Sequence, residues 1–264
     1  MIRNVFFSIV LLTIVSCKTN KVPIQISSET ESTPAYKEQM ENLEQMIYFR
    51  ATGNEPFWSL KISDNNIVFA SLNAGFESFN APFVAPIRAM DANVKMYRVA
   101  TESGNMNIEI RQEECINSMS GAISPYVVKI EITKGKTDNS IVFNGCGTYI
   151  TDAKLHDIWV LEKMNGENVT RTKFKREFPR IEINATTNKF FGFGGCNTMN
   201  GSLFFEKGLL RFTNIASTMM ACEPQNRESE FLTSLQSTTS YSVENMKLTL
   251  KNQSGIELIF KKVD

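Results

Sequence analysis

The sequence predicts a mainly β protein with two small antiparallel domains, each barrel-like or sandwich-like, and one packed α-helix in the second. Three observations lead to this fold class. Short runs of alternating, β-branched or aromatic residues recur along most of the chain. Residues that favour tight turns stand between these runs. One later stretch has the amphipathic period of a helix. Strands joined in this way are typical of a meander that curls on itself.

The N-terminus has the pattern of a bacterial lipoprotein signal peptide over residues 1–16. Arg3 precedes an apolar run, Val5–Val15, and small Ser16 leads to Cys17. The run has eleven residues, whereas a membrane-spanning helix needs about 20, so a signal peptide fits better than a permanent anchor. An uncleaved secretory signal or a short buried element is the alternative. We expect lipidation at Cys17 and, because Lys18 replaces the Asp of inner-membrane retention signals, an outer-membrane lipoprotein that faces the periplasm.

Composition separates a tether from two folded parts. Residues 17–45 are rich in Ser, Thr, Glu, Lys and Gln and poor in apolar side chains, which predicts a flexible tether. The remaining residues are enough for two domains, which we place at 46–151 and 152–264. The whole chain has 28 basic and 28 acidic residues. This balance argues against a nucleic-acid partner, since phosphate binding needs an excess of Lys and Arg.

The first domain is predicted to be an antiparallel meander. Turn residues separate its strands at Asp64–Asn66, Ser103–Asn105 and Lys134–Lys136. The predicted strands are Ile47–Ala51, Trp58–Ile62, Ile67–Leu72, Val94–Ala100, Met106–Arg111, Tyr126–Thr133 and Ile141–Asn144.

The second domain continues the strand pattern and adds the helix, which we expect over Asn226–Gln236. Asn165-Gly166 and Asn200-Gly201 are dipeptides that type I′ hairpin turns prefer, since both central residues take positive φ. The predicted strands are Ile158–Met164, Arg180–Asn184, Phe190–Phe193, Ser202–Glu206, Leu209–Phe212, Tyr241–Glu244, Lys247–Asn252 and Glu257–Lys261.

Two motifs carry a family resemblance. GFGGCNTMNG at Gly192–Gly201 and FTNIASTMMAC at Phe212–Cys222 closely resemble the META domain, the family of the heat-shock protein HslJ. Upstream, GNEPFWSLKI at Gly53–Ile62, CINSMSG at Cys115–Gly121 and GCG at Gly145–Gly147 resemble an uncharacterised bacterial envelope domain. The resemblance implies a role in envelope stress, heat response or antibiotic resistance. It supplies no catalytic residues.

The four cysteines after Cys17 form an even set, as expected for disulfides in an oxidising compartment. The economical pairing stays within each domain and joins Cys115 to Cys146 and Cys196 to Cys222. Structural zinc is the alternative, but zinc sites usually have cysteine pairs two to four residues apart, and none occurs here. No CxxC motif indicates a thiol oxidoreductase. We therefore expect two disulfides, no metal and no cofactor.

The remaining polar and aromatic motifs indicate a binding surface rather than an active site. Phe57 and Trp58 follow Pro56 at a strand entry, where they either plug the end of the barrel or offer a ligand platform. The lone histidine, His156, has no nucleophile motif to accompany it. The residues expected to form the ligand or partner surface are Glu55, Phe57, Trp58, Ser118, Ser120, Asn197 and Asn200.

These observations predict a non-enzymatic envelope lipoprotein that acts as a binding or stress-protective module. Its partners would be the membrane, through the lipid anchor, and an unknown envelope protein or small ligand. The alternative is an inhibitor of a lytic enzyme, a lysozyme or a protease, that presents a disulfide-braced loop containing Ser118 to a foreign active site. An enzyme that acts on envelope polymers is a third hypothesis, which lacks a recognisable site.

Overall fold

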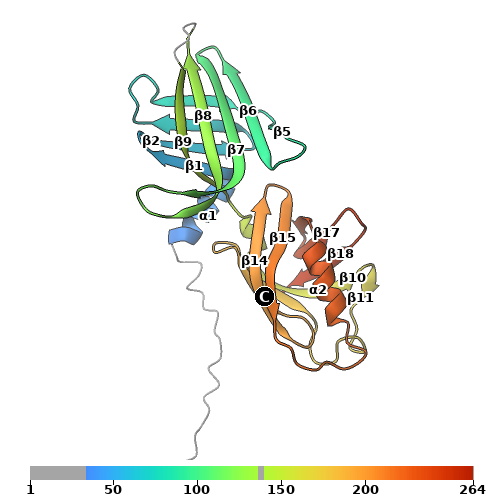
Figure 1. The fold of residues 1–264 in the computed structure, drawn as a ribbon. Coiled ribbons are helices and arrows are strands. Elements are labelled where there is room, and N and C mark those ends of the chain that lie inside the picture. Colours follow the sequence, from blue (N-terminus) through green and yellow to red (C-terminus); the bar gives the residue numbers. More distant parts are fainter. Residues whose placement is uncertain (1–33, 136–139, 264) are drawn as a thin grey trace, which may run out of the picture.

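The computed structural model describes residues 34–135 and 140–263 and confirms the predicted fold class. The residues that the structure describes are 56% strand and 10% helix and form two curled antiparallel half-barrel sheets with two α-helices (Figure 1). The predicted signal peptide, Cys17 and the first part of the predicted tether lie outside the described residues. Within the described ranges, no helix has the length and apolar character needed to cross a membrane.

The first sheet has the strand order β4-β3-β2-β1-β9-β8-β7-β6-β5. All seven predicted strands are present. Two short strands were not predicted, because Ser, Asn and Pro dilute the strand signal of β4 and because β5 has only two residues. The strands are β1 (Ile47–Asn54), β2 (Phe57–Ser63), β3 (Asn66–Ser71), β4 (Ser78–Pro82), β5 (Ile87–Arg88), β6 (Val94–Thr101), β7 (Gly104–Ile116), β8 (Ile123–Lys134) and β9 (Ser140–Tyr149).

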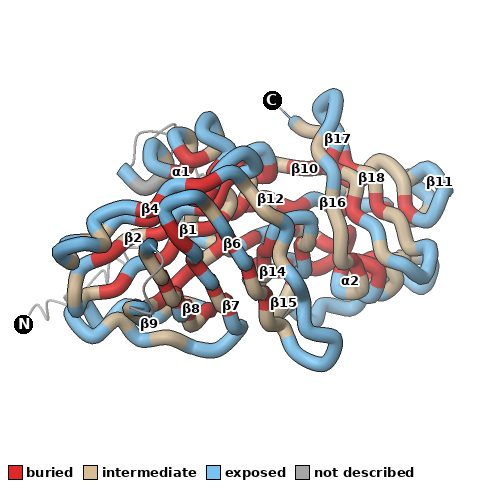
Figure 2. Tube along the Cα trace, turned by 90° about the horizontal axis from the view of Figure 1, so that it is seen from above, coloured by how far each residue is buried: buried red, intermediate tan, exposed pale blue. Residues whose placement is uncertain are grey.

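Alternating side chains fill the interior of this sheet. On β1, Phe49 and Ala51 are buried while Thr52 faces solvent, which is the pattern of a strand with one face on the core. Figure 2 shows the same alternation of buried and exposed residues along neighbouring strands. Trp58 lies inside the core, 4% exposed, and its indole Nε1 donates a hydrogen bond to the carbonyl oxygen of Asn144 over 3.2 Å. This burial supports the plug interpretation and removes Trp58 from the expected binding surface.

The second sheet has the order β15-β14-β13-β12-β10-β18-β17-β16, with β11 paired to β10. Helix α2 (Glu228–Ser237) buries Phe231 and Leu235 and confirms the predicted helix. The strands are β10 (Asp157–Met164), β11 (Glu167–Asn168), β12 (Arg180–Asn184), β13 (Lys189–Phe193), β14 (Thr198–Glu206), β15 (Leu209–Ser217), β16 (Ser240–Glu244), β17 (Lys247–Lys251) and β18 (Glu257–Lys262).

The two Asn-Gly dipeptides of this sheet behave differently. Asn165 and Gly166 have φ values of 53° and 82° and connect β10 to β11, as a type I′ turn requires. The hairpin turn predicted at Asn200-Gly201 is wrong, because both residues lie inside strand β14. A Cβ atom at Gly201 would collide with the ring of Phe190, so this glycine is needed for close packing.

Helix α1 (Pro34–Glu44) occupies the last part of the predicted tether. Its Gln39 is buried, and the amide nitrogen donates to the carbonyl oxygens of Thr151 at 2.7 Å and Ala185 at 3.2 Å. Glu38 on the same helix forms an ion pair with Arg50 of β1. The tether prediction is therefore wrong for Pro34–Glu44. Polar contacts with residues distant in sequence hold this helix, and local composition does not reveal them.

Candidate functional site

The two disulfides join the cysteines that the sequence paired. Cys115 is bonded to Cys146, and Cys196 is bonded to Cys222. The first bond links β7 to β9 across the intervening strand β8, at a point where the β7–β8 register is interrupted between Gln112 and Cys115. It therefore stands at the base of the loop that connects β7 to β8.

Hydrogen bonds fix the conformation of this loop. The side-chain oxygen Oδ1 of Asn117 accepts from the backbone N–H groups of Met119 and Ser120, each over 3.0 Å. The backbone N–H of Asn117 donates to the carbonyl of Ala122 over 2.9 Å. Gly121 has a φ of 68°, a conformation that glycine adopts without strain. The loop is thus ordered by its own backbone and side chains.

The same loop is tied to the turn between β1 and β2. The amide nitrogen Nδ2 of Asn54 donates to Asn117 Oδ1 and to Ser118 Oγ, both over 3.0 Å. Glu55 lies in that turn, which contains a cis peptide bond at Glu55–Pro56, and Phe57 is the first residue of β2. The structure therefore brings two motifs that are about 60 residues apart in sequence to one end of the first sheet.

Large apolar side chains are exposed around this end. Their exposed fractions run from 49% for Phe57 to 78% for Leu72. The backbone N–H of Leu72 donates to the carbonyl of Phe57 over 2.9 Å, so these two residues are adjacent. We refer to five exposed residues together as the apolar rim: Phe57, Leu72, Ile116, Met119 and Ile123. Exposed apolar side chains that lie together on a protein surface mark a site of interaction with a partner.

Four of the predicted surface residues lie at the rim or beside it. Glu55, Phe57, Ser118 and Ser120 are all exposed. Sequence reasoning missed Leu72, Ile116 and Ile123. Ile116 and Ile123 pair with each other where β7 and β8 extend beyond their predicted ends, and Leu72 directly follows β3.

The two predicted residues of the second sheet do not belong to this surface. Asn200 is exposed on β14 opposite Phe191, in the second sheet. Asn197 is buried, and its side chain donates to the carboxylate of Glu228 over 2.7 Å while accepting from the backbone N–H of Met220 over 2.7 Å. Asn197 therefore holds together the buried region beside the Cys196–Cys222 disulfide. Its assignment to the ligand surface is corrected accordingly.

Glu228 is the centre of that interior network. Its Oε1 accepts from the backbone N–H groups of Cys196 at 3.1 Å and Asn197 at 2.6 Å. The carboxylate and the two sulfur atoms of Cys196 and Cys222 lie within 4.8 Å of one another, a distance that would suit a metal site. The sulfur atoms are bonded to each other, however, and thiolates are the form that binds zinc. This network could not be predicted from the sequence, because a Glu at the start of a helix is ordinary.

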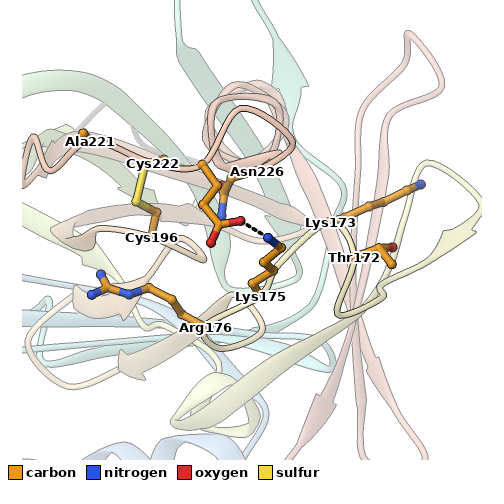
Figure 3. Close-up of a pocket in the computed structure, with 9 residues that line it drawn as sticks. Thr172, Lys173, Lys175, Arg176, Cys196, Ala221, Cys222 and Asn226 are labelled. Carbon is orange, nitrogen blue, oxygen red and sulfur yellow. Dashed lines mark ion pairs between the residues drawn. A yellow bond between two sulfur atoms is a disulfide. The ribbon is translucent and has the colours of Figure 1, made fainter.

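A pocket of about 230 Å³ lies next to the second disulfide and is lined by three basic residues (Figure 3). Lys175 forms an ion pair with Glu223 over 2.5 Å, shown as a dashed line. Lys173 is paired with Glu167. Arg176 is the third basic residue. Two of the three cations are therefore balanced by neighbouring carboxylates, which leaves little net positive charge in the pocket to attract an anion.

His156 contacts Ala185 and helix α1. Its Nδ1 accepts a hydrogen bond from the backbone N–H of Ala185 over 3.3 Å, and its ring is 5.6 Å from the ring of Tyr36 on α1. Trp159, on the strand that follows, is turned inward and donates to the carbonyl of Leu155 over 2.9 Å. These contacts position the start of the second sheet.

Fold and disulfides together define a mainly β protein of two units with one disulfide in each. Residues 151–264 match the META domain family, so the second unit is a META domain. An NMR structure of a protein from Burkholderia xenovorans is 22% identical, with 41% of this chain and 82% of that chain covered and a TM-score of 0.35. A second NMR structure is 27% identical, with coverages of 41% and 90% and a TM-score of 0.34. No curated protein matches the chain.

Proposed function

We propose that this protein is a non-enzymatic lipoprotein of the cell envelope, an HslJ-like stress-protective module that binds an envelope partner through the apolar rim. The META domain supports a possible role in the envelope or in stress. The observation that carries the binding role is the rigid, disulfide-braced loop with its exposed Ile116, Met119 and Ile123.

Rigidity is the reason this loop suits recognition. A loop already held in one conformation loses little conformational entropy when a partner binds, so more of its contact energy appears as affinity. The Asn117 and Asn54 hydrogen bonds and the Cys115–Cys146 bond supply that order. Exposed acidic residues, among them Glu55 and Glu114, flank the rim. The complementary partner surface would be an apolar patch bordered by basic groups.

The alternative function, inhibition of a lytic enzyme, is favoured by one further observation. Figure 1 shows the β7–β8 hairpin projecting from the side of the first sheet, which is a shape that can enter a cleft. A purified inhibitor would reduce the activity of a lysozyme or protease at a one-to-one ratio, and Met119→Glu would abolish this effect. A binding module of another kind would leave these enzymes unaffected.

The binding role can be tested with a matched pair of variants. Met119→Glu places a charge on the rim, whereas Met219→Glu makes the same change at a side chain that is 99% exposed in the META domain. Affinity capture from native envelope extract should retain a partner with the wild type and with Met219→Glu, and lose it with Met119→Glu. Equal capture by all three proteins would contradict the proposed role of the rim.

The lipid anchor has its own test. Cys17→Ser should abolish labelling by radioactive palmitate while circular dichroism of the folded units stays unchanged. Continued labelling of Cys17→Ser would overturn the lipoprotein assignment without affecting the binding proposal.

A further inference from the structure

The two units meet at a buried carboxylate. Glu206 is the last residue of β14, at the tip of the β14–β15 hairpin of the META domain, and it is buried. Its Oε2 lies 2.9 Å from Nζ of Lys95, and its Oε1 accepts from Nδ2 of Asn93 at 2.7 Å and from the hydroxyl of Tyr126 at 2.5 Å. Both carboxylate oxygens are therefore bound by donors.

All three donors belong to the first sheet. Lys95 lies on β6, Asn93 immediately precedes that strand, and Tyr126 lies on β8. Nζ of Lys95 also donates to Oδ1 of Asn93 over 2.7 Å and stands 5.3 Å from the centre of the Tyr149 ring. The first sheet thus holds the donors in place through contacts of its own, as a preformed binding site does.

The charge on Lys95 requires an anion at this point. Lys95 is 4% exposed, and a buried ammonium without a counterion is strongly destabilising. The neighbouring contact of the tip is weaker, because the ion pair between Lys207 and Asp64 is about half exposed and exposed pairs contribute little. Lys207 also lies over the ring of Tyr48, 4.4 Å from its centre, but the buried polar contact between the hairpin tip and the first sheet is made by the carboxylate of Glu206.

We propose that Lys95, Asn93 and Tyr126 form a carboxylate-binding site of the first sheet, which Glu206 of the META domain occupies in the same chain and which accepts the carboxylate of a separate small molecule when that of Glu206 is removed. The ligand class is a monocarboxylate with a short aliphatic chain. The site also faces the rings of Tyr126 and Tyr149, which favour a compact ligand over a long polar one.

The test uses the full chain with Glu206→Ala. This substitution removes one methylene and one carboxylate, which together are the size of acetate. Glu206→Ala should lower the melting temperature by about 10 °C in sodium chloride at pH 7, since breaking a buried pair is costly. Acetate at the same ionic strength should restore at least half of that loss, with a saturating dependence on concentration. The wild type should melt at the same temperature in both salts.

A second variant identifies the site. Glu206→Ala combined with Lys95→Met should show no difference between acetate and chloride, because the cation that binds the carboxylate is gone while an unbranched apolar chain of nearly the same length remains. If Glu206→Ala does not fold in chloride, its refolding yield in acetate becomes the measurement, and recovery in acetate alone supports the proposal. Equal behaviour of Glu206→Ala in the two salts, folded or unfolded, would overturn the proposal, and so would an acetate response that survives Lys95→Met.

Discussion

The two disulfides of this protein close loops of similar length, but one supports an exposed loop and the other a buried hydrogen-bond network. Cys115–Cys146 lies at the base of a loop whose apolar side chains point outward, and its neighbour Glu114 is in solvent. Cys196–Cys222 covers an inward network in which the carboxylate of Glu228 binds backbone N–H groups. Cysteine spacing alone therefore predicts stabilisation, whereas the surroundings of each bond decide between a recognition loop and an internal support.

The largest effect expected from this comparison concerns the two glutamates. Glu228→Ala would leave two buried N–H donors and the Asn197 amide without their acceptor, at a cost of roughly 4 kcal/mol of unfolding free energy. Glu114→Ala, beside the other disulfide, should change it by less than about 0.5 kcal/mol. Urea denaturation of the two variants measures both values. Similar losses in both variants would contradict the contrast between the inner and the outer disulfide.

Removal of each disulfide comes next. The pairs are separated by 31 and 26 residues, so loop closure predicts a loss of about 3.5 kcal/mol for either double Cys→Ser variant. Partner capture should separate them, because only Cys115→Ser/Cys146→Ser loosens the apolar rim. A loss of capture in Cys196→Ser/Cys222→Ser alone, with the protein still folded, would place the recognition surface in the META domain.

A pH dependence should distinguish the junction between the units from both disulfides. Burial by itself would raise the pKa of Glu206, but hydrogen bonds from Tyr126, Lys95 and Asn93 outweigh it and lower the pKa below the ordinary glutamate value of 4.5. The folded protein therefore binds this proton less readily than the unfolded chain, so the stabilisation is present above pH 4.5 and is lost as the pH falls through the folded value.

Thermal melts from pH 6 to pH 3 test this sign. Glu206→Gln should flatten the decrease in melting temperature over that range relative to the wild type, since the substituted side chain does not titrate. Glu114→Gln is the matched control on the exposed side and should keep the wild-type slope. An unchanged slope in Glu206→Gln would contradict the lowered pKa.

The smallest effect on stability is expected at the rim itself. Met119→Glu changes a side chain that is already in water, so the free energy of unfolding should shift by less than about 0.5 kcal/mol. Denaturation curves of this variant and of Met219→Glu should overlap with that of the wild type. A loss above 2 kcal/mol would show that Met119 packs on the protein and is not available to a partner.

Elements with strong local patterns could be predicted from the sequence, and features that depend on distant contacts could not. β12, with alternating Ile181 and Ile183, was predicted at its observed bounds. Helix α1 was missed because buried polar contacts of Gln39 hold it. Unusual local motifs predicted that Glu55, Phe57, Ser118 and Ser120 lie on the surface, and all four are exposed. Their neighbours Ile116 and Ile123 are brought there by the pairing of β7 with β8, and Leu72 by a backbone hydrogen bond to Phe57, and composition encodes neither contact.

The central claim, that the protein acts by binding through its rim and not by catalysis, is tested most directly by complementation of a deletion strain under the envelope stress that exposes its phenotype. Any hydrolytic mechanism that uses an imidazole must use His156, since the chain has one histidine. The account predicts that His156→Ala restores survival to the wild-type level, whereas Met119→Glu, produced in equal amount and equally stable, does not. Full rescue by Met119→Glu together with failure of a folded His156→Ala protein would contradict it.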